Sequence, residues 1–111
     1  MKVLFYLFMF ALIQGQKILI PMDQSQNDHL KAYGIAYLVL KNNVNLEWLL
    51  NYHGGSFLVD SHKFIETECR LRGVTFNKIN SNELLNIYST IDQGNMDIML
   101  LEKKPKIAIY T

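Results

Sequence analysis

The sequence predicts an α/β fold with a parallel, doubly wound sheet of the flavodoxin or amidotransferase type, incomplete within these residues. Short apolar runs rich in β-branched residues alternate with longer stretches in which apolar residues recur at helical spacing. This alternation follows the order β-α-β-α-β-α-β, which favours crossover connections and helices on both faces of one sheet. The last apolar run, 106–111, has no helix after it.

The first fifteen residues have the three-part pattern of a secretory signal peptide. Lys2 supplies a positive charge, 3–13 is an uninterrupted apolar run, and a polar, small-residue exit follows around Gly15. As a helix the apolar run spans about 17 Å, short of a hydrocarbon core of roughly 30 Å. We therefore expect cleavage after Gly15, a domain over 16–111, and export to the periplasm or the cell exterior. A buried N-terminal strand is the alternative.

The first half of the domain reads as strand, helix, strand and turn. Residues 17–21 are a β-branched run that ends at a proline, which suits a buried parallel strand. A Ser-x-x-Asp pair resembling a capping box opens a helix over 25–41, with apolar residues on more than one side. Two asparagines break this helix. A second strand over 44–50 and a turn over 51–56 follow.

The second half repeats the alternation. Gly73 stands where a helix would end, and Asn80 with Glu83 forms a pair typical of a helix start. The expected elements are a helix from Asp60 or Ser61 to Arg72, a strand over 74–79, a helix from Asn80 to near Gly94, an ambiguous stretch over 95–104 and a fourth strand over 106–111.

Composition excludes several classes of function. The formal net charge is +1, which gives no electrostatic footprint for binding nucleic acid. Cys69 is the only cysteine, so neither an intrachain disulfide nor a thiolate zinc site is available, and we expect it to be a small packed side chain. The three histidines lack metal-ligand spacing. We expect no metal, no cofactor, no stable membrane span and no catalytic residue within this chain.

Two stretches carry the polar residues best placed to bind a small-molecule ligand. A His-Gly-Gly-Ser sequence lies in the expected turn, where backbone N–H groups could approach an anion. The alternative is that the glycines only supply the turn geometry. A second stretch follows the first strand, beside the carboxyl edge of the expected sheet, where doubly wound folds bind ligands. The candidate ligand-binding residues are His53, Gly54, Gly55, Ser56, Asp23 and His29.

Four stretches together resemble a group of exported bacterial proteins catalogued as asparagine synthetase B. They are Lys17-Ile-Leu-Ile-Pro-Met-Asp, His29-Leu-Lys-Ala-Tyr-Gly-Ile-Ala-Tyr, Trp48-Leu-Leu-Asn-Tyr-His-Gly-Gly-Ser-Phe and Lys104-Pro-Lys-Ile-Ala-Ile-Tyr. The resemblance implies a longer protein that continues into a glutamine-amidotransferase-like α/β region. The N-terminal cysteine and the Ser-Gly-Gly-x-Asp-Ser loop of glutamine-dependent asparagine synthesis are both absent from this sequence.

The leading hypothesis is therefore the N-terminal part of an exported, amidotransferase-like protein without a complete active site in this chain, whose partner is the remaining C-terminal portion. The alternative is a non-catalytic extracytoplasmic binding or surface-assembly module. Asparagine synthesis itself is a third possibility that depends on the resemblance alone.

Overall fold

The sheet of this protein is antiparallel throughout. The computed structural model describes residues 16–102, and its five-stranded sheet has the strand order β4-β1-β3-β2-β5. All four pairs of neighbouring strands run antiparallel. The strands are β1 (Lys17–Ile20), β2 (Leu46–Leu49), β3 (Ser56–Asp60), β4 (Asn77–Ile79) and β5 (Ile98–Leu101).

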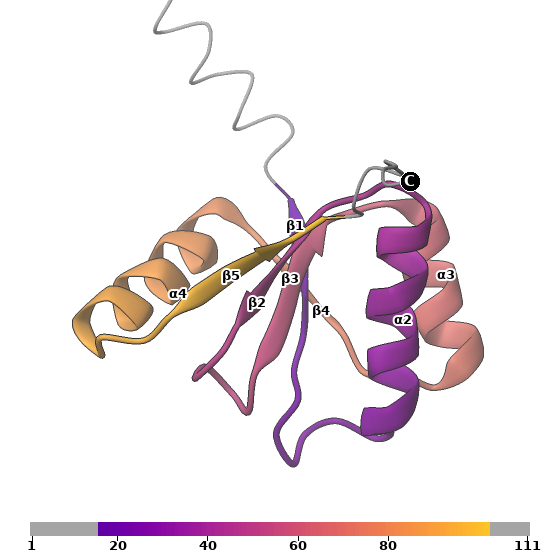
Figure 1. Ribbon diagram of the computed structural model, residues 1–111, viewed down its shortest axis with the longest axis horizontal. Helices are drawn as coiled ribbons and strands as arrows, with labels where there is room; N and C mark the ends of the chain where they lie inside the picture. The colour runs from indigo at the N-terminus through magenta and orange to yellow at the C-terminus, as the bar shows by residue number, and fades with distance from the viewer. Residues whose placement is uncertain (1–15, 103–111) are drawn as a thin grey trace, which may run out of the picture.

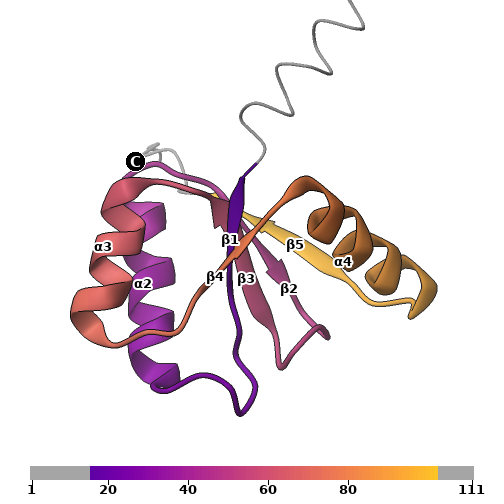
Figure 2. The same ribbon diagram turned by 180° about the vertical axis from the view of Figure 1, so that it is seen from behind.

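Helices cover both faces of this sheet (Figures 1 and 2). On one face lie α2 (His29–Lys41) and α3 (Lys63–Arg72), and on the other lies α4 (Ser81–Gln93). Because successive strand residues point to opposite faces, Ile18 and Ile20 enter the core under α2 and α3, whereas Leu19 enters the core under α4. The elements from β1 to β4 form a split βαβ arrangement, in which β3 lies between β1 and β2.

Local signals set most of the helix ends. The helix α2 begins after Asp28, whose side chain accepts a hydrogen bond from the Lys31 backbone N–H at 3.0 Å. The helix α4 begins at the predicted Asn80–Glu83 capping box, which is confirmed. Gly73 ends α3 in the left-handed conformation, with φ 70°, also as predicted.

The prediction of a parallel, doubly wound sheet is wrong, because residues 56–60 form a strand that was not expected. The preceding turn reverses the chain, so β3 returns antiparallel beside β2 and places Phe57 opposite Trp48. This hairpin takes the place of one of the expected crossovers. The strand β3 then pairs with β1 on its other side, and every pair of neighbouring strands within 16–102 is antiparallel.

Several boundaries also differ from those expected. The residue before α3 is His62 rather than Asp60 or Ser61, and its side chain makes no capping hydrogen bond. The ambiguous stretch 95–104 contains β5. The signal peptide expected over 1–15 and the strand expected over 106–111 lie outside the described residues. Within 16–102, no helix is both long and apolar enough to cross a membrane.

Candidate functional site

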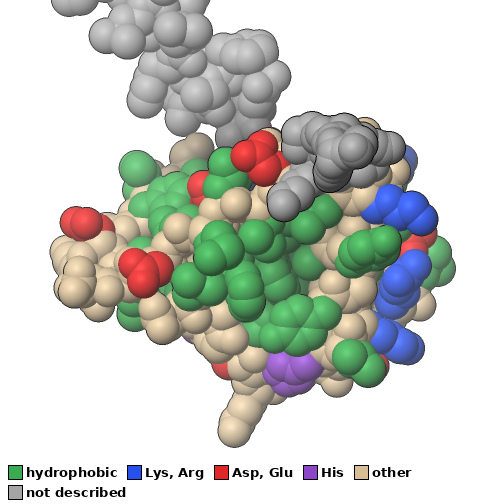
Figure 3. Space-filling view, in the orientation of Figure 1, with side chains coloured by type: hydrophobic (Ala, Val, Ile, Leu, Met, Phe, Trp, Pro, Cys, Tyr) green, Lys and Arg blue, Asp and Glu red, His purple; other side chains and the backbone are tan. Residues whose placement is uncertain are grey.

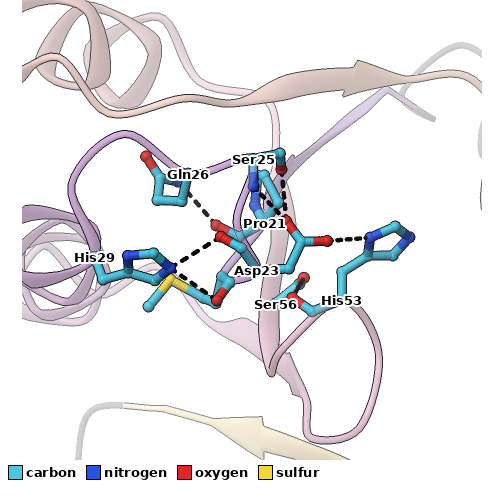
Figure 4. A network of polar contacts seen from close by, with 8 residues as sticks. Pro21, Asp23, Ser25, Gln26, His29, His53 and Ser56 are labelled. Carbon is cyan, nitrogen blue, oxygen red and sulfur yellow. Dashed lines mark hydrogen bonds and ion pairs between the residues drawn. The ribbon is translucent and has the colours of Figure 1, made fainter.

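The two candidate ligand-binding stretches meet at one end of the sheet (Figure 4). The loop between β1 and α2 contacts the turn between β2 and β3 through Asp23 and His53, whose Oδ2 and Nδ1 atoms are 2.7 Å apart. The Met22 backbone N–H also donates to the His53 carbonyl oxygen at 3.1 Å. All six residues singled out in the sequence therefore belong to one group, which we call the loop cluster: Asp23, His29, His53, Gly54, Gly55 and Ser56.

The glycines of the loop cluster are required by the turn itself. His53, Gly54 and Gly55 have φ angles of 46°, 79° and 91°, all in the left-handed region. A Cβ atom on Gly54 would lie 2.6 Å from the Met22 carbonyl oxygen, which is closer than real contacts allow. The N–H groups of Gly55 and Ser56 donate to the Tyr52 carbonyl oxygen. The geometry therefore favours the turn interpretation over an anion-binding loop.

Asp23 is the centre of the loop cluster. Its Oδ1 atom accepts hydrogen bonds from the Ser25 backbone N–H at 3.0 Å and the Ser25 hydroxyl at 2.6 Å. These bonds, together with the one from His53, hold the pKa of Asp23 well below its usual range. The carboxylate is thus ionised at neutral pH and ties the turn to the loop.

The other two polar side chains of the loop cluster are also engaged within the fold. The Nε2 atom of His29 lies 3.0 Å and 2.9 Å from the carbonyl oxygens of Met22 and Asp23, so this nitrogen donates a proton. Ser56 is fully buried, and its hydroxyl donates to the His53 carbonyl oxygen at 3.1 Å. Neither side chain is presented to a ligand through these atoms.

A buried glutamine anchors the same loop from the other side and was missed in the sequence. Gln26 donates through Nε2 to the carbonyl oxygens of Pro21 and Thr75, at 2.8 Å and 3.0 Å, and accepts from the Thr75 backbone N–H at 2.7 Å. It thereby fastens the β1–α2 loop to the segment that enters β4. A single glutamine in a polar loop carries no pattern that predicts this role.

The loop cluster holds a His–Asp pair but no nucleophile beside it in the described part of the chain. Asp23 orients His53 as an acid–base pair requires. The hydroxyls of Ser25 and Ser56, however, donate to Asp23 and to the His53 backbone. Cys69 is fully buried, as expected, and burial raises the pKa of its thiol to about 11. Residues 16–102 also contain no group of three His, Cys, Asp or Glu side chains that could hold a metal ion.

A second surface consists of aromatic and apolar side chains and lies between α2 and β5 (Figure 3). Trp48 stacks on Phe57 with ring centroids 5.8 Å apart, and Tyr33 meets the same Phe57 edge-on at 5.9 Å. Tyr37 is one helical turn beyond Tyr33. Met99 lies opposite Trp48 in the β2–β5 ladder, so both side chains are on one face. We call Tyr33, Tyr37, Trp48 and Met99 the aromatic surface.

The aromatic surface is exposed because the helices cover only part of their face of the sheet. The β1 and β3 side chains under α2 and α3 are buried, and so is Leu46 on β2. Trp48, also on β2, is only partly buried. The side chains of Tyr33, Tyr37 and Met99 are 49%, 68% and 46% exposed. Figure 3 shows hydrophobic side chains gathered over this part of the molecule, between α2 and β5. Contiguous exposed apolar surface of this kind marks interaction sites.

The chain matches no protein-family model, no curated protein and no solved structure. The resemblance to proteins catalogued as asparagine synthetase B therefore stays a prediction.

Proposed function

We propose that residues 16–102 form a non-catalytic binding module of an exported protein, and that the aromatic surface docks onto the downstream portion of the same protein. The observation that carries this proposal is the group of exposed apolar side chains on α2 and β5 around the partly buried Trp48. Glutamine-amidotransferase-like chemistry, implied by the resemblance, is assigned in this proposal to the downstream portion.

The composition of the aromatic surface suits a protein partner. Tyr, Trp and Met are enriched in protein interfaces, and charged side chains are depleted at their centres. A hollow of about 120 Å³ beside Lys17, Glu47 and Asp60 is lined by none of the four residues of the aromatic surface, and it is smaller than the roughly 300–1,000 Å³ typical of ligand pockets.

The position of β5 supports an intramolecular partner. Its last residue, Leu101, packs against the same core as Trp48, and the described chain reaches Glu102 directly afterwards. The last described strand therefore ends two residues after Met99 of the aromatic surface. A segment that follows directly in the chain is tethered at this point. Such a segment competes with free partners at an effective concentration in the millimolar range.

Trp48 gives a direct test because it is the only tryptophan in the sequence. The experiment compares acrylamide quenching of its fluorescence in residues 16–111 and in the mature protein extended by the coding sequence downstream of Thr111. We expect a clearly smaller quenching constant in the extended protein. Equal quenching constants, or a stop codon directly after Thr111, would contradict the proposal.

Export is tested separately on the native product. N-terminal sequencing should find Gln16 as the first residue in the extracytoplasmic fraction. A product that retains Met1 and stays in the cytoplasm would contradict export and leave the docking proposal to the quenching result.

A further inference from the structure

We infer that Gln16 of the exported protein is converted to pyroglutamate, a cyclic residue without a free α-amine. The inference rests on the export part of the proposed function, because it requires cleavage after Gly15, and it is independent of the docking of the aromatic surface. It assigns a covalent modification, which removes the terminal charge, to the residue at which the described fold begins.

Gln16 adjoins the sheet without a spacer. It directly precedes β1, which starts at Lys17, and it is exposed. The Ser61 backbone N–H donates to the Gln16 carbonyl oxygen at 3.2 Å, so the pairing of β1 with β3 extends one residue beyond Lys17 and Asp60. The backbone of Gln16 is therefore held on its C-terminal side, while the residue remains open to solvent.

Cleavage after Gly15 gives Gln16 both of the groups that react. An α-amine has a pKa of about 7.7–8.0, so part of it is neutral and nucleophilic near neutral pH. Its nitrogen attacks Cδ of the carboxamide of the same residue, and the new N–Cδ bond closes a five-membered lactam. The Cδ–Nε2 bond breaks, and Nε2 takes the proton given up by the amine and leaves as ammonia. The step needs no oxidant, reductant or second substrate, and the two groups are held together within one residue.

The fold accommodates this ring closure. The ring contains only the nitrogen, Cα and side-chain atoms of Gln16, so the carbonyl oxygen keeps its hydrogen bond from Ser61. The antiparallel pairing of Lys17 with Asp60 is likewise unchanged. The modification therefore replaces a charged, reactive end of the chain with a neutral one and leaves β1 in place.

The position of β1 explains what a closed end protects. The strand lies between β3 and β4 in the sheet, and the Lys17 ammonium forms an ion pair with Asp60 at 2.7 Å. An aminopeptidase needs a free α-amine, and no further residue separates Gln16 from the strand. Removal of Gln16 and Lys17 would already delete the ion pair and shorten β1. Pyroglutamate blocks this stepwise loss at its first step.

The test is mass spectrometry of the N-terminal peptide from the native extracytoplasmic product, because stepwise chemical sequencing cannot start at a lactam. An endoproteinase that cleaves after acidic residues releases the peptide 16–23, which ends at Asp23. Its mass should be lower than that of the free-amine peptide by one molecule of ammonia. A synthetic, isotope-labelled peptide 16–23 with a free amine is added at the start and measures cyclisation during sample preparation.

Gln16→Asn is the matched control variant. Its side chain is one methylene shorter, so the same attack would close a strained four-membered ring, and its N-terminal peptide should keep the free amine. The purified wild-type product should also resist an aminopeptidase, whereas Gln16→Asn should lose its first residue under the same conditions.

Three outcomes would overturn the inference. A native peptide with no more lactam than the labelled standard would do so and would leave export standing. A product that begins at another residue of the mature part would do so as well, because Gln16 would not be terminal. Retention of Met1 in the cytoplasm would contradict both this inference and export, while the quenching result would still decide the docking of the aromatic surface.

Discussion

Replacing Gly54 by alanine tests the close packing of the β2–β3 turn on the β1–α2 loop. Gly54 has φ 79°, and an added Cβ would lie 2.6 Å from the Met22 carbonyl oxygen and 2.9 Å from the Asp23 nitrogen. Left-handed backbone in alanine costs about 1–2 kcal/mol. Overpacking against backbone atoms that must shift adds about 1–3 kcal/mol. We therefore expect Gly54→Ala to lower the free energy of unfolding by about 2–5 kcal/mol.

Gly73→Ala is the matched control. Gly73 has a similar φ of 70°, but nothing lies within 4 Å of an added Cβ. Gly73→Ala should therefore lower the free energy of unfolding only by the backbone contribution of about 1–2 kcal/mol. For a domain of this size each kcal/mol corresponds to roughly 4–8 °C in Tm, so the two variants should be separable by thermal and urea unfolding. Equal losses for the two variants would refute the close approach of the turn to Met22.

Three further predictions follow from the buried and ion-paired groups. The Ser61 hydroxyl donates to the buried Glu66 carboxylate at 2.6 Å, so Glu66→Gln should lower the free energy of urea unfolding by about 1–3 kcal/mol. The control Glu68→Gln removes an exposed ion pair and should lower it by about 0.5 kcal/mol or less. Similar losses in the two variants would contradict a special role for Glu66. Hydrogen bonds from Ser25 and His53 lower the pKa of Asp23, so its contribution to stability should be complete above about pH 4 and disappear as the pH falls further. The urea midpoint of Asp23→Asn should consequently fall less than that of the wild type between pH 5 and pH 2, and parallel pH profiles would contradict this. Cys69 should react with a thiol reagent at pH 8 only in urea, and rapid labelling of the native protein would show that it is not buried.

Local sequence patterns were sufficient to predict the ends of elements where a residue type strongly favours one backbone geometry or one capping interaction. A proline ended β1, an Asn–Glu pair capped α4, and Gly73 ended α3, all as predicted. Strand pairing was not predictable in this way. Phe57, Leu58 and Val59 form a run of only three apolar residues, which is too short to separate from a turn or a helix start. Without that strand, the connection after β2 was expected to be a crossover, and the sheet was expected to be parallel.

The loop cluster depended on the same missing strand. Asp23 and His53 are 30 residues apart in the chain, and they meet only because β3 returns beside β1. A turn containing two glycines between two apolar runs is a hairpin signal, and it was the one pattern that could have predicted this contact. The aromatic surface was harder still to predict. Tyr33 and Tyr37 have helical spacing, but the strand order of the sheet decides which face of their helix is buried and which is exposed.

Cross-strand proton contacts test the antiparallel sheet most directly, and both the loop cluster and the aromatic surface depend on that sheet. In the β2–β3 hairpin, Trp48 faces Phe57 and Leu46 faces Val59 as non-hydrogen-bonded pairs, whose Hα atoms approach closely only in an antiparallel ladder. A nuclear Overhauser spectrum of residues 16–111 should contain strong Hα–Hα cross-peaks for both pairs. Absence of these peaks, with contacts instead between β1 and β2, would contradict the fold and every proposal that rests on it.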